Sequence, residues 1–365
     1  MEGKRYVLVV NPGSTSTKLA IFEGEKSIVA TNLNHDVEVI RSFDTIYDQK
    51  DMRIKVILEW LDEVNVKLSE LLCVVGRGGL LSSMPSGTYK VTDKMLEDLK
   101  IGVQGQHASN LGGIIADEIA KKVNVSAYIV DPVAVDEICD EARISGLPEL
   151  PRKSLVHALN MKAVARRVCK EKGLKLSECS FVIAHLGGGI SVSPFKYGKL
   201  LDCNNASQEG PFSPDRTGGL PVGDLVDMVF SGKYSQKELS RKIMGQGGLI
   251  GYLGTNDGRV IDKRIDDGDK KAEMIFKAMV YQISREIGAM ATVINGKMDG
   301  IIVTGGLAYN KRLMNWINEY VGFIAPIIAV PGEDEMLALA EGALRVENRE
   351  EDFKIYENEI KKFGK

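Results

Sequence analysis

VLVVNPGSTSTK, residues 7–18, runs from a short apolar segment into a polar turn rich in glycine and hydroxyl side chains. A second apolar segment and Gly24 follow it. FVIAHLGGGIS, residues 181–191, has the same plan and leads to Gly198. A constant offset of 174 residues relates the two stretches, from their first apolar residues to their closing glycines. Each stretch predicts a strand, a tight turn and a second strand, so we expect a duplicated domain.

The first turn carries side chains suited to an anion. Asn11, Ser14, Ser16 and Lys18 supply one amide, two hydroxyls and one cation within eight residues. Alternation along an extended segment places Ser14, Ser16 and Lys18 on one side, where they suit a row of phosphate oxygens. The spacing is not that of a P-loop, because the second glycine of G-x-x-x-x-G-K-[ST] is missing. The pattern therefore predicts a phosphate-binding turn of another kind.

Two further turns are rich in glycine. Gly187, Gly188 and Gly189 are consecutive, and glycine permits close backbone approach and positive φ. With the first turn, they predict that the two halves of the chain grip one polyphosphate. TGGLAYN, residues 304–310, lies between a predicted strand and a predicted helix, where an adenosine moiety could meet a helix N-terminus. Read alone, each glycine motif also fits a plain structural turn.

The composition is that of an ordinary globular protein with room for two domains: 365 residues, 44% hydrophobic and 27% charged. A net charge of −3 and a pI near 6.0 favour neither a nucleic-acid partner nor a membrane surface. The apolar runs are too short for a membrane span or a signal peptide. Five cysteines without a C-x-x-C pair, and only four histidines, argue against a disulfide framework and a zinc centre. We therefore expect a cytoplasmic protein.

Alternating strands and helices predict α/β architecture, and a hairpin at the start of each half predicts mixed sheets. The predicted strands are Tyr6–Val10, Lys18–Phe22, Leu72–Val75, Ala127–Val130, Phe181–His185, Ser191–Phe195, Ile301–Thr304 and Ile327–Val330. The predicted helices are Met52–Val66, Leu111–Lys122, Leu155–Lys172, Lys270–Asn295, Lys311–Tyr320 and Glu335–Glu347. With a boundary near Leu150, the first domain comprises residues 1–150 plus about 335–365, and the second comprises residues 151–334.

These motifs resemble the signatures of the acetate and butyrate kinase family, within the fold class of sugar kinases, actin and the 70-kDa chaperones. VVNPGSTSTK resembles the first signature, HLGGGIS matches the H-x-G-x-G-x-S of the second, and TGGLAYN resembles the adenosine loop. The resemblance covers nearly the whole chain. It implies two ribonuclease-H-like, actin-like ATPase domains with mixed sheets flanked by helices. VGRGGLL (residues 75–81) and Gly188, where acetate kinases typically carry Asn, resemble the butyrate kinases of the family.

The resemblance also implies site residues. Those implied to bind ATP or ADP are Asn11, Ser14, Ser16, Lys18, His185, Gly187, Gly188, Gly189, Gly305, Gly306 and Asn310. Those implied to act in catalysis are Arg77, His107, Asp131, His157 and Arg216. Mg²⁺ is implied to be served by Asp131 and by Glu335, with Glu333 and Asp334 as open alternatives to the latter. Five of these residues also fit a structural role: an ion pair for Arg77 and Arg216, a packed or capping histidine for His157, an Asp-Pro turn for Asp131 and an acidic helix start for Glu335.

The implied reaction is the reversible transfer of the γ-phosphoryl group of ATP to butyrate, giving butanoyl phosphate and ADP. Val156 stands where acetate kinases usually carry Phe, and the smaller side chain leaves room for a longer or branched acid such as isobutyrate. Acetate and propionate are alternative acceptors. From other classes, the alternatives are a sugar or polyol kinase with Asp131 as general base, and a non-metabolic actin-like nucleotide-binding module. The family implies a homo-oligomer, at least a dimer.

Overall fold

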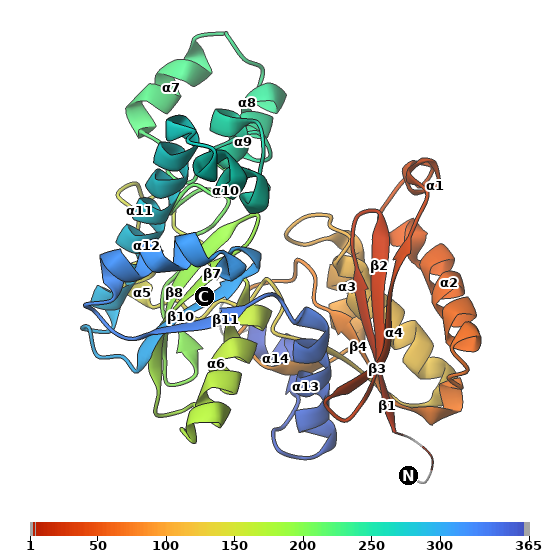
Figure 1. Cartoon of the computed structure of the whole chain (residues 1–365). Coiled ribbons are helices and arrows are strands. Elements are labelled where there is room, and N and C mark those ends of the chain that lie inside the picture. The colour runs from red at the N-terminus through yellow and green to blue at the C-terminus, as the bar shows by residue number, and fades with distance from the viewer. Residues whose placement is uncertain (1–2, 4, 361–365) are drawn as a thin grey trace. The chain divides into compact units, whose positions relative to one another are not determined.

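Two mixed β-sheets organise the chain, one in each of two units (Figure 1). The computed structural model describes residue 3 and residues 5–360. Unit 1 comprises Met1–Asp136 and Asp334–Lys365, and unit 2 comprises Glu137–Glu333. The boundary predicted near Leu150 falls inside unit 2, because Glu137 already pairs with Lys162 of that unit. Residues 361–365 of the predicted first domain lie outside the described residues.

The sheet of unit 1 has seven strands in the order β12-β5-β6-β4-β1-β2-β3. Its strands are β1 Tyr6–Pro12, β2 Ser16–Glu23, β3 Lys26–Asn34, β4 Leu71–Arg77, β5 Thr88–Lys90, β6 Ser126–Val130 and β12 Lys354–Ile355. β1, β2 and β3 form an antiparallel meander. β4 pairs parallel with β1, and β6 pairs parallel with β4.

The sheet of unit 2 repeats this plan with five strands in the order β11-β10-β7-β8-β9. Its strands are β7 Ser180–Leu186, β8 Ile190–Lys196, β9 Lys199–Leu200, β10 Gly300–Gly305 and β11 Ile327–Pro331. β7, β8 and β9 are antiparallel, while β10 and β11 continue the sheet in parallel. The order β9-β8-β7-β10-β11 therefore matches β3-β2-β1-β4-β6. The predicted duplication, the hairpin at the start of each half and the mixed sheets are confirmed.

Every predicted strand and helix occurs, with ends shifted by a few residues. The helices are α1 Val37–Arg41, α2 Lys50–Glu63, α3 Asp93–Ile101, α4 Asn110–Val123, α5 Asp140–Arg143, α6 Ala158–Lys172, α7 Val222–Phe230, α8 Gln236–Ile243, α9 Gly248–Leu253, α10 Gly258–Asp266, α11 Lys270–Val293, α12 Lys311–Val321, α13 Glu335–Glu347 and α14 Tyr356–Ile360. Short 3₁₀ turns are η1 Tyr47–Gln49, η2 Leu68–Glu70 and η3 Gly306–Tyr309. Among the described helices, none has the length and apolar character needed to cross a membrane.

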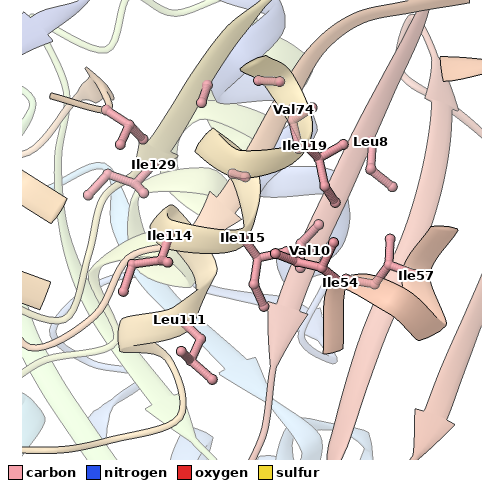
Figure 2. Close-up of a cluster of buried hydrophobic side chains, with 14 of the residues drawn as sticks. Leu8, Val10, Ile54, Ile57, Val74, Leu111, Ile114, Ile115, Ile119 and Ile129 are labelled. Atoms are coloured by element: carbon pink, nitrogen blue, oxygen red, sulfur yellow. The ribbon is translucent and has the colours of Figure 1, made fainter. Parts of the chain in front are cut away.

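Helix α4 forms the centre of the unit 1 core (Figure 2). Its apolar side chains pack with those of the strands, and Ile54 and Ile57 of the neighbouring helix α2 belong to the same cluster. The labelled core residues are Leu8, Val10, Ile54, Ile57, Val74, Leu111, Ile114, Ile115, Ile119 and Ile129. In unit 2, α11 has the corresponding place, and its buried Met279, Val280 and Ile283 pack with strand residues such as Val192. Each unit thus has a hydrophobic core of its own.

Close backbone packing fixes the end of β4, where Arg77 stands. A Cβ atom on Gly76 would clash with the carbonyl of Gly112 in α4, so both positions need glycine. Helix α13 contacts β1, β4 and β6 and returns the chain to unit 1. A Cβ on Gly342 of α13 would lie 2.5 Å from the Val130 side chain. These contacts place the first residue of α13 next to the carboxyl ends of β1 and β4.

Candidate functional site

The first hairpin turn presents the predicted polar side chains. The N–H of Gly13 donates to the carbonyl of Ser16 at 2.7 Å and closes the turn. Ser16 and Lys18 alternate along β2 with a fully buried Thr17, so they face away from the core. Ser14 lies in the turn itself, before β2 begins. The predicted alternation therefore holds for Ser16 and Lys18, whereas Ser14 joins them from the turn.

Four charged or polar side chains meet beside this turn. Asn11 and Lys18 are directly opposed in the β1–β2 register, which brings their side chains to one face. The buried Asn11 amide donates to Glu335 Oε2 at 3.0 Å. The other oxygen of Glu335 pairs with Arg77 Nη1. Glu335 thus joins a β1 residue, an arginine at the end of β4 and the first turn of α13.

Arg77 is followed by a loop that is held onto the start of α4. Asn110 Oδ1 accepts from the N–H of Leu80 at 2.9 Å, and a Cβ atom on Gly79 would clash with Asn110. His107 precedes the same helix, with its Nδ1 2.8 Å from Ser109 Oγ. Partial burial, and secondly the positive charge of Arg77, lower the pKa of His107. Arg77 and His107 therefore lie within electrostatic reach of each other.

Asp131 is engaged in a turn at the end of β6. Its side chain is 3% exposed, and its Oδ1 accepts from the N–H of Gly87 at 2.7 Å. Its φ of 37° is unusual for a non-glycine residue before proline. The Asp-Pro turn that the sequence offered as an alternative accounts for these contacts. The bond to Gly87 commits one carboxylate oxygen.

In unit 2, two predicted histidines stack. The rings of His157 and His185 have centroids 4.1 Å apart and planes inclined by 18°. His157 Nδ1 lies 3.0 Å from the hydroxyl of Ser191. The buried His185 bonds through Nδ1 to Asn160 Oδ1 at 2.9 Å and through Nε2 to Glu333 Oε1 at 3.0 Å. Val156, immediately before His157, is buried at 4% exposure.

The glycine turn between β7 and β8 packs closely against the side chain of Arg216. A Cβ on Gly189 would stand 2.6 Å from Arg216 Nη1, whereas a Cβ on Gly188 would meet Asp215 at an ordinary 3.7 Å. Ser213 Oγ donates to the carbonyl of Gly188 at 2.5 Å and accepts from the N–H of Arg216 at 3.1 Å. The arginine and the turn are therefore held together, and a side chain at position 189 would require the Arg216 guanidinium to move.

A cavity of about 650 Å³ opens at the predicted adenosine turn. Its lining includes Gly306 and Tyr309 of η3 and Asp257 and Asp262 on the α10 side. Asn310 also lines it, but its side chain is already used: Oδ1 caps α12 through Leu313, and Nδ2 donates to Asp262. None of the motifs identified in the sequence points to the α10 side of this cavity. The Asp257-Gly258 turn signal before α10 could have marked it.

Gly305 has a strict steric role beneath the cavity. Its φ is 89°, and a Cβ there would lie 2.5 Å from the carbonyl of Leu186. The neighbouring Gly306 has open space around its Cβ position. Mutual backbone bonds of 3.1 and 3.0 Å tie Gly305 to Gly332. The turn at the end of β10 is thereby pinned to both neighbouring strands.

Mg²⁺ was predicted to be served by one or two acidic residues. Within residue 3 and residues 5–360, no group of three or more His, Cys, Asp or Glu is placed to hold an ion. Mg²⁺ commonly binds one or two carboxylates and completes its shell with water and substrate phosphates. Glu335, next to the first turn, fits that pattern. Glu333 instead faces His185.

The known proteins that this chain resembles include acetate and butyrate kinases. The acetokinase family matches residues 150–319. A probable butyrate kinase 2 of Caldanaerobacter subterraneus subsp. tengcongensis is 55% identical over 350 residues, 96% of this chain and 99% of the relative. Butyrate kinase 1 of Clostridium acetobutylicum is 53% identical over 351 residues, with the same coverage. An acetate kinase structure from Porphyromonas gingivalis shares the fold, with a TM-score of 0.78 at 19% identity over 94% of this chain and 99% of that one.

Proposed function

The chain belongs to the acetokinase family, and on this premise we propose that it is an ATP-dependent carboxylate kinase whose acceptor is butyrate. The products are butanoyl phosphate and ADP, and the reaction is reversible. One observation carries the proposal: each unit pairs an arginine with an anion-binding turn. Arg77 stands beside the turn that carries Lys18, and Arg216 lies against Gly189.

The chemistry explains why arginines are needed. A carboxylic acid has a pKa of about 4–5, so at neutral pH the acceptor is already an ionised nucleophile and needs no general base. Its charge repels the phosphates of ATP, and the barrier is lowered mainly by positioning and by stabilising charge. Guanidinium groups bind carboxylate and phosphoryl oxygens bidentately. In this mechanism Arg77 and Arg216 hold the reacting groups, and His157 donates to a phosphoryl oxygen.

The nucleotide is assigned to unit 2. The cavity at Gly306 and Tyr309 has a volume suited to a nucleoside, and it opens at a helix N-terminus. Asp257 and Asp262 line it with carboxylates, the acceptor groups that bind ribose hydroxyls and exocyclic amines. Gly187 to Gly189 offer backbone groups for the phosphates. In unit 1, Asn11, Ser14, Ser16 and Lys18 take the transferred phosphoryl group.

Mg²⁺ fits the donor set as an ion bound mainly by nucleotide phosphates. Glu335 is the protein carboxylate proposed to serve it, with Asp131 in a supporting position. When bound, the ion neutralises phosphate charge. Glu335 also pairs with Arg77 and accepts from Asn11, so the same carboxylate keeps the arginine in place.

We propose further that the chain works as a cytoplasmic homo-oligomer. Its five cysteines are free thiols, which suits a reducing compartment. Helix α7 has no buried residue, and it leaves Val222 74% and Phe230 85% exposed. Apolar side chains of that size are commonly covered by a second copy. Light scattering of the wild-type chain and of Phe230→Asp tests this, and a monomeric wild type would refute it.

The test of the activity is an ATP-dependent hydroxamate assay with acetate, propionate, butyrate and isobutyrate. Hydroxylamine traps acyl phosphates and leaves sugar phosphates untouched, so it separates carboxylate kinases from sugar kinases. We expect the highest kcat/KM with butyrate, because each buried CH₂ contributes about 0.8 kcal/mol. If none of the four acids gave a trapped acyl phosphate, the carboxylate kinase activity would be refuted. A strong preference for acetate would refute only the choice of butyrate.

A further inference from the structure

Arg53 of α2 is a fully buried arginine behind the first hairpin turn. Its side chain is 0% exposed. Nη1 donates to the carbonyl of Ser16 and to Thr17 Oγ1, both at 3.0 Å. Nη2 donates to the carbonyl of Ser14 at 3.2 Å and to Gln49 Oε1 at 2.9 Å. The guanidinium thus holds the backbone of the turn from the core side.

This buried cation has no counter-charge in the described chain. All four acceptors are neutral, and among residue 3 and residues 5–360 no carboxylate pairs with Arg53. Its Nε is also buried and has no hydrogen-bond partner there. Burial lowers the pKa of Arg53 to about 10, so the group stays charged at neutral pH. An uncompensated buried charge is costly, and a neutral side chain would avoid that cost.

The hydrogen bonds also fix which groups the turn shows to solvent. In a planar trans peptide the C=O and the next N–H point in opposite directions. Because the carbonyl of Ser14 points inward to Arg53, the N–H of Thr15 points outward. Ser14 and Thr15 are both exposed, and within the described residues their N–H groups have no hydrogen-bond partner. The exposed turn therefore carries two unused N–H donors, and that of Thr15 points outward.

We propose that Arg53 is a positioning residue for phosphoryl transfer, which keeps the carbonyls of Ser14 and Ser16 inward and thereby the N–H of Thr15 outward toward the phosphoryl group. Its charge is balanced only when that anion binds. The inference rests on the proposed function, in which this turn receives the transferred phosphoryl group. Arg53 does not touch the substrate; it acts through the backbone of Ser14 and Ser16 and through its field, which a low-dielectric surrounding screens weakly.

The test compares Arg53→Lys and Arg53→Gln with the full-length wild type. Lys keeps the positive charge but lacks the two guanidinium nitrogens that bond to the carbonyls of Ser14 and Ser16. Gln lacks both the charge and this pair of nitrogens. We expect kcat to fall about 100-fold for Gln, the lower end of the range seen when a charge-stabilising donor is removed, and less, about 10-fold, for Lys, which keeps the charge. The KM for ATP should change little, because the proposed nucleoside cavity lies in unit 2. A purely structural Arg53 would instead lower the melting temperature and leave kcat of the folded enzyme unchanged.

Arg345 provides the matched control. It also lies in unit 1, has a side chain 19% exposed, and pairs with the carboxylate of Glu351 at 2.9 Å. Arg345→Lys and Arg345→Gln should change stability but not kcat. Equal losses of kcat at positions 53 and 345 would overturn the proposal, as would wild-type kcat in a folded Arg53→Gln. Should Arg53→Gln fail to fold, the kcat of Arg53→Lys decides in the same way.

Hydrogen exchange separates this inference from the proposed function. Inorganic phosphate should slow exchange of the Ser14 and Thr15 amides in the wild type, and Arg53→Gln should abolish that protection. This result would stand even if no carboxylate were phosphorylated, in which case only the activity would be refuted. Phosphate protection that is equal in wild type and Arg53→Gln would refute the role of Arg53 while leaving the activity intact.

Discussion

His185 stacks on His157 with ring centroids 4.1 Å apart, and His185 itself cannot turn freely. Its Nδ1 bonds to Asn160 and its Nε2 to Glu333. Because the buried His185 ring is held in place, stacking against it also fixes the position of the half-buried His157 ring. Glu333 serves the histidine pair, while Glu335, two residues further on, serves Arg77 and Asn11.

This division of partners predicts which carboxylate serves Mg²⁺. Glu335→Gln should raise the free Mg²⁺ needed for half-maximal activity by about 10-fold or more, because it removes the charged oxygen donor while preserving shape. Glu333→Gln keeps an acceptor for His185 Nε2 and should leave the Mg²⁺ requirement unchanged. The measurement is the initial rate against free Mg²⁺ at saturating ATP. The reverse pattern would assign the ion to Glu333.

Arg216→Ala should lower kcat by about 10²–10³, because a donor to the transferring group is lost. Arg264 is the control: it lies in the same unit, and its contacts are Asp269 and the carbonyl of Leu253. Arg264→Ala should keep kcat within about twofold, as expected for a side chain outside the chemistry. Near-normal turnover by Arg216→Ala would remove this arginine from the mechanism.

Gly189→Ala should reduce activity through Arg216 without unfolding the protein. The new methyl group would stand 2.6 Å from Arg216 Nη1, and a flexible guanidinium can move aside. Gly188→Ala adds the same methyl one residue earlier, where the nearest neighbour is Asp215 at 3.7 Å. We expect kcat to fall about 10-fold or more for Gly189→Ala only, as when a positioned donor is displaced. Equal kcat in the two variants would contradict this coupling.

The hairpins could be predicted from sequence because apolar runs and glycine turns recur at one offset, and local patterns determine such elements. The site could be predicted only in part. Glu335 meets Asn11 across 324 residues of chain, and no local pattern encodes such a pairing. Arg53 was missed because an arginine on a helix normally indicates a solvated face. The four short helices between Val222 and Asp266 were missed as well, since three of them have at most one buried residue each and give a weak core pattern.

Gly305→Ala and Gly306→Ala should separate folding from nucleotide binding. At Gly305 the φ of 89° and the carbonyl of Leu186 exclude a side chain, so we expect a loss of about 1–3 kcal/mol of stability or more. At Gly306 the Cβ position is open, but the residue lines the cavity. Gly306→Ala should keep its melting temperature and raise the KM for ATP. Thermal unfolding and ATP titrations check both, and an unchanged KM would argue against nucleoside binding there.

The pKa of His107 gives a pH-dependent prediction with a definite sign. Burial and then Arg77 lower it from the ordinary value of 6.5, so the folded state favours the neutral ring. Well above pH 6.5 the ring is neutral in both states, and the lowered pKa of His107 does not affect the free energy of unfolding. As the pH falls from 6.5 through the folded pKa, the unfolded chain binds the proton first, so the free energy of unfolding decreases. Arg77→Gln should raise the pKa of His107 only in part, because burial is the larger cause. Arg77→Lys, which keeps the charge, should not. NMR titration of the ring in the three proteins measures this directly. An unchanged pKa in Arg77→Gln would mean that the Arg77 charge does not reach His107.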